Sequence, residues 1–179
     1  GDVVGRPVQA WQDVAAPTVD TMGAVSYNDT STLQTHWQIN WNPTEVDLVP
    51  DQGGSVVSTV RFQVPTSGAY SVLAEFADNQ GAGGREGDAW VLTDSSVLHH
   101  TPQLPANTNG TVSGRVFVTY DETINLNAGD SIYFASGKGS AGGDHVLLRA
   151  VVEGEGGEGG EGGEGGGGGG GNFDSTIAG

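Results

Sequence analysis

Residues 64–72, Val-Pro-Thr-Ser-Gly-Ala-Tyr-Ser-Val, and residues 126–134, Leu-Asn-Ala-Gly-Asp-Ser-Ile-Tyr-Phe, each place a turn beside a strand-like run. The turns are Pro-Thr-Ser-Gly at 65–68 and Asn-Ala-Gly-Asp at 127–130. Glycine gives both turns backbone freedom, and the aspartate caps the second. Apolar residues alternate around the turns, as they do in a half-buried β-strand. Both stretches therefore predict strand–turn–strand units.

The same alternation extends through residues 55–152, and the sequence shows no convincing helical period. Residues 36–41, His-Trp-Gln-Ile-Asn-Trp, also alternate and are expected to form one strand. We predict an all-β fold, an antiparallel β-sandwich of jelly-roll type with about eight strands, over about residues 10–152. The expected core consists of Val60, Phe62, Tyr70, Val72, Phe76, Val116, Val118, Ile132, Phe134, Val146 and Leu148.

These two turn motifs carry a resemblance to a known class of domain. Residues 64–72 resemble a Val-Pro-x-x-Gly-x-Tyr-x-Val hairpin, and residues 126–134 resemble a Leu-x-Ala-Gly-Asp-x-Ile-x-Phe hairpin. Both are common in extracellular jelly-roll domains, which include carbohydrate-binding modules and secreted bacterial surface proteins. The resemblance covers roughly residues 55–152 and implies the fold, because the motifs specify turns and not ligands.

Charge and composition exclude several classes of partner. The chain has 179 residues, a net charge of −16, one lysine (Lys138) and five arginines. So few cations cannot form a basic patch, so we expect no nucleic-acid binding and no attachment to anionic membranes. There is no cysteine and no apolar run of membrane-spanning length. The start at Gly1 fits a secreted protein whose signal peptide has been removed, although a chain cut at that point would look the same. We expect an extracellular or cell-surface location.

The C-terminal quarter has a different composition. We divide the chain into a sandwich domain at residues 1–153, a Gly/Glu-rich tether at 154–171 and a terminal strand at 172–179. Within the terminal strand, Phe173, Ser175 and Ile177 share one face, as expected of a strand that fills an open sheet edge. A spacer followed by a strand is what donor-strand assembly requires, and a head-to-tail junction of this kind produces filaments. The N-terminal segment, residues 2–11, is an alternative exchanged strand.

The sequence contains no catalytic signature, so we expect no enzyme activity and no cofactor. Adjacent strand residues point to opposite faces, so His99 and His100 are not expected to bind one metal ion. The loop acids Asp78, Glu86 and Asp88 are weak candidates for calcium ligands, because their spacing matches no established loop.

Two kinds of surface feature remain as candidates. Trp37, Trp41 and Trp90 are candidates for a sugar-stacking platform, with Gln38, Asn40 and Asn42 as hydrogen-bonding neighbours. The alternative for Trp37 and Trp41 is core packing, because they share a strand face with Ile39. Asn28 and Asn109 begin Asn-x-Thr sequons and are candidate N-glycosylation sites.

Two functions follow from these features. The first is a structural subunit of an extracellular filament or surface assembly, which polymerises by donating residues 172–179 to a neighbouring copy. The alternative is a secreted carbohydrate-binding module whose tail is an interdomain linker. The partners are then other copies of the chain or glycans.

Overall fold

The computed structural model describes residues 9–12, 24–36, 39–50, 57–80, 87–137, 145–154 and 173–178. Their secondary structure is almost entirely β, with one short 3₁₀ turn, η1 (Val112–Gly114). The strands are β1 (Gln9–Gln12), β2 (Ala24–Tyr27), β3 (Gln34–His36), β4 (Ile39–Trp41), β5 (Val46–Val49), β6 (Val57–Gln63), β7 (Gly68–Asp78), β8 (Ala89–Thr93), β9 (Val97–Thr101), β10 (Val118–Leu126), β11 (Ser131–Ser136), β12 (Val146–Gly154) and β13 (Phe173–Ala178). Among the described residues, no helix has the length and apolar character needed to cross a membrane.

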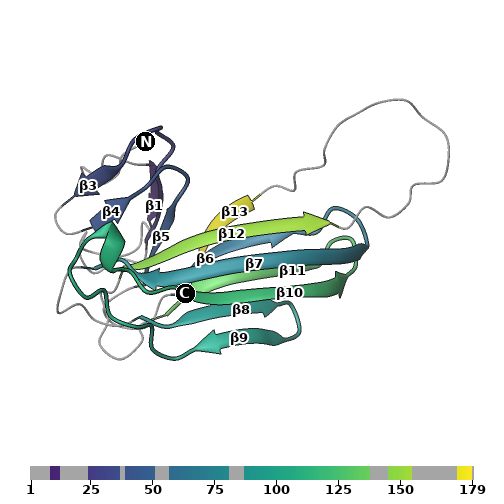
Figure 1. The fold of residues 1–179 in the computed structure, drawn as a ribbon. Helices are drawn as coiled ribbons and strands as arrows, with labels where there is room; N and C mark the ends of the chain where they lie inside the picture. The colour runs from purple at the N-terminus through teal and green to yellow at the C-terminus, as the bar shows by residue number, and fades with distance from the viewer. Residues whose placement is uncertain are drawn as a thin grey trace.

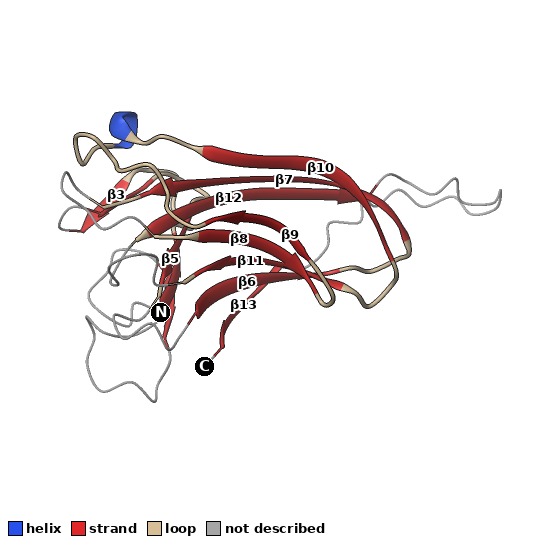
Figure 2. Ribbon diagram, turned by 90° about the horizontal axis from the view of Figure 1, so that it is seen from below, coloured by secondary structure: helices blue, strands red, loops and turns tan. Residues whose placement is uncertain are grey.

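The strands form two packed layers with β3 and β4 as a separate hairpin (Figures 1 and 2). One sheet has the order β1-β2-β5-β12-β7-β10, and the other has the order β13-β6-β11-β8-β9. Eight of these strands, β5 to β12, make the layers β5-β12-β7-β10 and β6-β11-β8-β9, and all their pairings are antiparallel. This is the interleaved order of a jelly roll, so the predicted fold class is confirmed. The added strands β1, β2 and β13 extend the edges of the two layers.

The two turn motifs lie against each other at one end of the sandwich. The Val64 amide donates to the Asp130 carbonyl oxygen at 2.9 Å, and the Gly129 amide donates to the Val64 carbonyl oxygen at 2.9 Å. The Ala128 amide donates to Ser67 Oγ at 2.8 Å. Gly129 has a φ of 92°, a conformation that glycine adopts without a Cβ penalty. The motifs therefore fix one end of the fold together.

The core lies between the layers and consists of the inward-facing residues of both sheets. Ten of the eleven predicted core residues belong to this cluster or pack on it, but Val116 does not. Val116 is 45% exposed because β10 begins only at Val118. Over residues 115–117 the buried side chain is that of Arg115, which leaves Val116 directed at solvent. The assignment of Val116 to the core was wrong.

The single strand predicted over residues 36–41 was also wrong. β3 pairs antiparallel with β4, with His36 opposite Ile39 and Gln34 opposite Trp41, so the chain reverses between them. Period-two alternation continues across a short reversal that contains no Gly, Pro, Asn or Asp, and so it cannot mark such a turn.

The terminal strand lies on the same chain's second sheet. β13 pairs antiparallel with β6, from Phe173 opposite Phe62 to Ala178 opposite Val57. The described chain thus holds its own terminal strand at the edge of β6. The prediction that the side chains of Phe173 and Ile177 are buried in another copy stays a prediction, because the side chains of β13 lie outside the described residues.

Candidate functional site

The tryptophans predicted as a sugar platform do not form one in the described residues. Trp41 is fully buried, with 0% of its surface exposed, and forms a small apolar cluster with Ile39. Trp90 on β8 is half-buried, and one face of its ring is stacked on His100 of β9 at 3.3 Å between centroids. Trp37 and Gln38 lie outside the described residues. Trp41 was therefore wrong as a platform residue, because a ring without exposed surface cannot stack on a sugar.

The two candidate glycosylation sites differ in their surroundings: Asn28 is buried beside Trp41, and Asn109 is exposed. The side-chain amide of Asn28, which is 0% exposed, donates to the carbonyl oxygens of Thr32 at 2.9 Å and Trp41 at 2.8 Å. Glycosylation would replace one of the two Nδ2 hydrogens and so remove at least one of these bonds, which gives the amide a structural role; use of this sequon stays a prediction. Asn109 is exposed and remains a candidate site; its Oδ1 accepts from the Thr111 hydroxyl at 2.6 Å.

Of the calcium candidates, the two described residues, Asp78 and Asp88, each accept hydrogen bonds from backbone amides. Asp78 is 1% exposed, and its carboxylate accepts from the backbone amides of Gln80 and Asn107, at 2.8 Å each. Asp88 accepts from the Gly137 amide, and Glu86 lies outside the described residues. Over the described ranges, no three or more His, Asp or Glu side chains are grouped to hold a metal ion. Asp78 and Asp88 fix loops in the structure.

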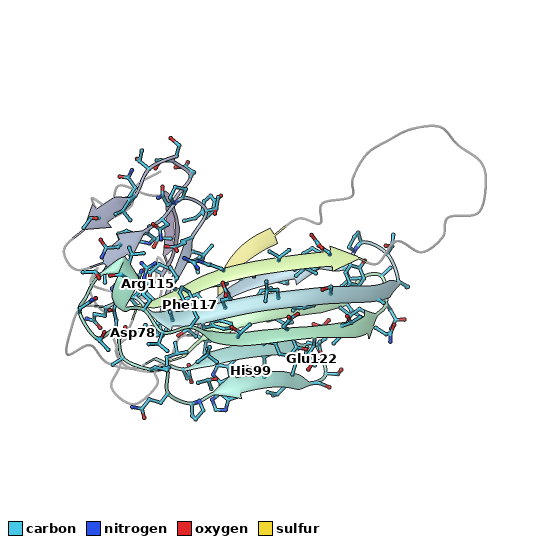
Figure 3. All side chains as sticks on the ribbon, viewed as in Figure 1. Asp78, His99, Arg115, Phe117 and Glu122 are labelled. Atoms are coloured by element: carbon cyan, nitrogen blue, oxygen red, sulfur yellow. The ribbon has the colours of Figure 1, made fainter. Side chains whose placement is uncertain are left out.

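A buried ionic cluster that the sequence did not predict joins the N-terminal strands to the sandwich. The Arg115 guanidinium donates from Nη1 to both oxygens of Glu45, at 3.2 and 3.0 Å, and from Nη2 to Asn79 Oδ1 and the Asn40 carbonyl oxygen. The two ion-paired side chains are 1% and 2% exposed. Arg149 reaches the same carboxylate at 2.7 Å and lies over the Phe117 ring, 4.5 Å from its centroid. Figure 3 shows Arg115, Phe117 and Asp78 towards the same end of the sandwich.

Burial and the surrounding polar groups have opposite effects on the pKa of the Glu45 carboxyl. Burial alone raises its pKa, but hydrogen bonds from the Asn42 side chain and backbone, a hydrogen bond from Arg149 and the charge of Arg115 together outweigh burial. The pKa of Glu45 is therefore lowered, so Glu45 is ionised at neutral pH. All these contacts are internal to the cluster, which indicates a structural role.

A cleft lies where the two sheets have open edges. β9 is the edge of one layer and β10 the edge of the other, and they are not paired with each other. Between them lies a cleft of about 460 Å³, lined by Thr93, Asp94, Ser95, Ser96, Leu98, Ile124, Asn125, Leu126, Asn127 and Asp130. Its size is within the range of small-molecule sites.

The cleft has an apolar floor and a polar rim. Leu98, Ile124 and Leu126 are partly buried and pack on the main core, so they form the floor. Hydroxyl, amide and carboxylate groups from the β8–β9 turn and the β10–β11 turn form the rim. No lysine or arginine is among the lining residues.

Hydrogen bonds hold both sides of the rim in place. Asp94 accepts from the Ser131 amide at 2.8 Å and from the Tyr133 hydroxyl at 2.7 Å, which ties the β8–β9 turn to β11. Asp130 accepts from the Asn127 amide at 2.8 Å, which closes the other turn. The cleft is therefore preformed.

Further along β9 and β10, one aromatic ring from each strand lies beside the other. The His99 and Tyr120 rings lie 5.9 Å apart, and Figure 3 places His99 and Glu122 on this side of the molecule. Burial, with a smaller effect of the nearby Glu122 charge, raises the pKa of Tyr120. The phenol therefore stays neutral at physiological pH.

Sequence reasoning missed the cleft and recognised only one of its two turns, residues 127–130. Nothing in that turn shows that the fold brings it close to the turn between β8 and β9. The useful signal was the presence of two polar turns flanked by apolar edge strands.

Comparison with known proteins gives similarity only to solved structures. No protein-family model matches the chain, and no curated protein matches its sequence. Carbohydrate-binding modules are among the similar structures. A family 35 module from an environmental isolate is 16% identical, with 62% of this chain and 69% of that chain covered and a TM-score of 0.33. A family 35 module from Clostridium thermocellum is 13% identical, with 79% and 86% covered and a TM-score of 0.34. A module of the Cellvibrio mixtus lichenase 5A, in complex with cellotriose, is 18% identical, with 80% and 85% covered and a TM-score of 0.28.

Proposed function

We propose that this domain binds neutral glycans in the cleft between β9 and β10, in an extracellular setting and without catalysis. The observation that carries the proposal is the preformed cleft with an apolar floor and a hydrogen-bonding rim. Sugars present both kinds of surface, because the C–H face of a pyranose is apolar and its hydroxyls need donors and acceptors. Such clefts bind by apolar contact and use a few polar groups for orientation.

The negative charge of the cleft rim and of the whole chain favours neutral over anionic glycans as ligands. The rim includes Asp94 and Asp130, and the whole chain carries a net charge of −16. This field repels uronate and sulfate groups, so polyanionic polysaccharides are disfavoured. Neutral chains carry no such penalty.

The glycan proposal predicts a loss of binding when the cleft is filled. Asn125→Trp places a large side chain in the cleft and should abolish retardation of the protein in gels that contain a neutral polysaccharide. Asn125→Ala should weaken binding about fivefold to tenfold, which corresponds to one lost hydrogen bond. The measurement is affinity electrophoresis on soluble β-glucan, xylan and galactomannan, followed by calorimetry with oligosaccharides of the retarding polymer.

Thr123 provides the matched control. It lies two residues before Asn125 on the same face of β10, is exposed and does not line the cleft. Thr123→Trp and Thr123→Ala should bind as the unmodified chain does. Equal binding by Asn125→Trp and Thr123→Trp, or no retardation by any neutral polymer, contradicts the proposal.

A second candidate function starts from a different observation, the pairing of β13 with the edge of β6 in the same chain. In this candidate the chain is a subunit of an extracellular assembly that polymerises by donating residues 172–179 to a neighbouring copy. A terminal strand that occupies a sheet edge in its own chain is suited to the same edge in a second copy. Electron microscopy of concentrated full-length protein tests this candidate, with head-to-tail filaments as the expected result.

A further inference from the structure

We propose that the edge of β6 is the acceptor site for the terminal strand of a second copy. The pairing of β13 with β6 of its own chain, here called self-capping, is then the intramolecular form of the same contact. This inference rests on the strand-donation candidate and names its docking site, its register and the competing closed state.

The acceptor is defined by the pairing in the structure. β13 contributes residues 173–178, and positions 173, 175 and 177 lie opposite Phe62, Val60 and Ser58. The side chains of these three β6 residues are buried, with 2%, 6% and 0% exposed. Without β13, β6 would be the outermost strand of its sheet, with a row of unpaired backbone groups. A strand of identical sequence from a second copy satisfies these groups in the same register.

The connection to β13 is longer than closure within one chain requires. Its two ends lie near each other, because Gly154 is paired with Tyr70, Phe173 is paired with Phe62, and the rings of Phe62 and Tyr70 are 6.2 Å apart. Paired strands lie about 5 Å apart and packed sheets about 10 Å apart, so the ends are separated by at most about 20 Å. About six extended residues span that distance.

Residues 155–172 supply 18 residues for this connection, about three times the number needed. Loop closure becomes less probable as the 3/2 power of length, so the surplus lowers the probability of self-capping roughly fivefold relative to a minimal connection. The same surplus extends the reach of the strand to about 59 Å, well beyond its own sheet edge. Self-capping is therefore weakened while access to a second copy is gained.

The test is disulfide capture with full-length chains, which contain no native cysteine. Thr59 and Thr176 are register partners, and opposed residues of antiparallel strands have Cα separations compatible with a disulfide. Thr59→Cys protein and isotope-labelled Thr176→Cys protein are mixed, incubated and oxidised, and the products are weighed by mass spectrometry. Docking of β13 of one copy on β6 of another places the two cysteines opposite each other, so it should raise the yield of mixed disulfide dimer above the level that random collision gives.

We expect mixed dimers whose yield rises with protein concentration. The double variant Thr59→Cys/Thr176→Cys should form its disulfide within one chain. That chain should then no longer donate its terminal strand to a second copy. Val57→Cys is the off-register control, because Val57 pairs with Ala178 and is diagonal to Thr176. It should give several-fold less mixed dimer with Thr176→Cys.

The outcomes separate this inference from the filament candidate. Mixed dimers without filaments support the β6 acceptor and remove the filament function. Filaments without mixed dimers keep the filament function and overturn the β6 acceptor. Efficient closure of the double variant with no mixed dimer at any concentration overturns exchange, and failure of the double variant to close overturns the register.

Discussion

Replacing Arg115 with methionine is expected to lower the free energy of unfolding by about 3–5 kcal/mol, the range for breaking a buried ion pair. The guanidinium is 1% exposed and donates to Glu45, Asn79 and the Asn40 backbone. Its removal leaves the Glu45 carboxylate buried with only the half-exposed Arg149 as a cationic partner. Urea unfolding followed by tryptophan fluorescence measures the change.

Arg149→Met is the matched control for this prediction. Both arginines bind the same carboxylate, but the Arg149 side chain is 41% exposed. Exposed pairs contribute about 1 kcal/mol or less, so this variant should be much less destabilised. A loss at Arg115 no larger than the loss at Arg149 contradicts the role of Arg115 as the buried centre of the cluster.

The pH dependence provides a further check on the Arg115 variant. The pKa of Glu45 is lowered in the folded protein from its ordinary value of 4.5. A lowered pKa stabilises the fold above the unfolded value, and this stabilisation is lost as the pH falls through the folded value. The stability difference between the unmodified chain and Arg115→Met should therefore be full at neutral pH and shrink below about pH 4.5.

The sandwich fold could be predicted from the sequence because the patterns that specify its strands and turns extend over only a few residues. Alternation over a few residues identifies the inward face of a strand, and the turns at 65–68 and 127–130 identify where strands end. The same rule failed at Val116, where a buried arginine three residues before the start of β10 reverses the expected facing. It also failed at residues 36–41, where two three-residue strands pair across a reversal.

The ionic cluster and the cleft could not be predicted from such local patterns. Glu45 is 70 residues from Arg115 and 104 from Arg149 in sequence, and each acid or base alone resembles any surface charge. The cleft joins a turn after β8 to a turn after β10, which meet only because β9 and β10 are the edges of different sheets. Both features depend on topology, which alternation does not encode.

Trp41→Ala is expected to destabilise the protein by about 3–5 kcal/mol, as large core truncations do. The indole is fully buried, and the Trp41 carbonyl oxygen accepts from the buried Asn28 amide. The indole Nε1 has no hydrogen-bond partner, so Trp41→Phe removes an unsatisfied donor and should cost less than about 1.5 kcal/mol. Urea unfolding measures both variants. Hydrogen exchange over residues 24–50 shows whether the loss stays within the β3–β4 hairpin or spreads to β2 and β5.

Trp90→Ala is the comparison that separates packing from sugar stacking. Trp90 is half-buried and stacked on His100, so its removal should cost far less stability than removal of Trp41. Neither residue lines the β9–β10 cleft, so folded protein of both variants should bind a neutral oligosaccharide as the unmodified chain does. Loss of glycan binding in Trp41→Ala with stability unchanged would show that the ring is an exposed platform and that its buried position is wrong. Loss of stability with binding retained in the folded fraction places Trp41 in the small apolar cluster of the β3–β4 hairpin.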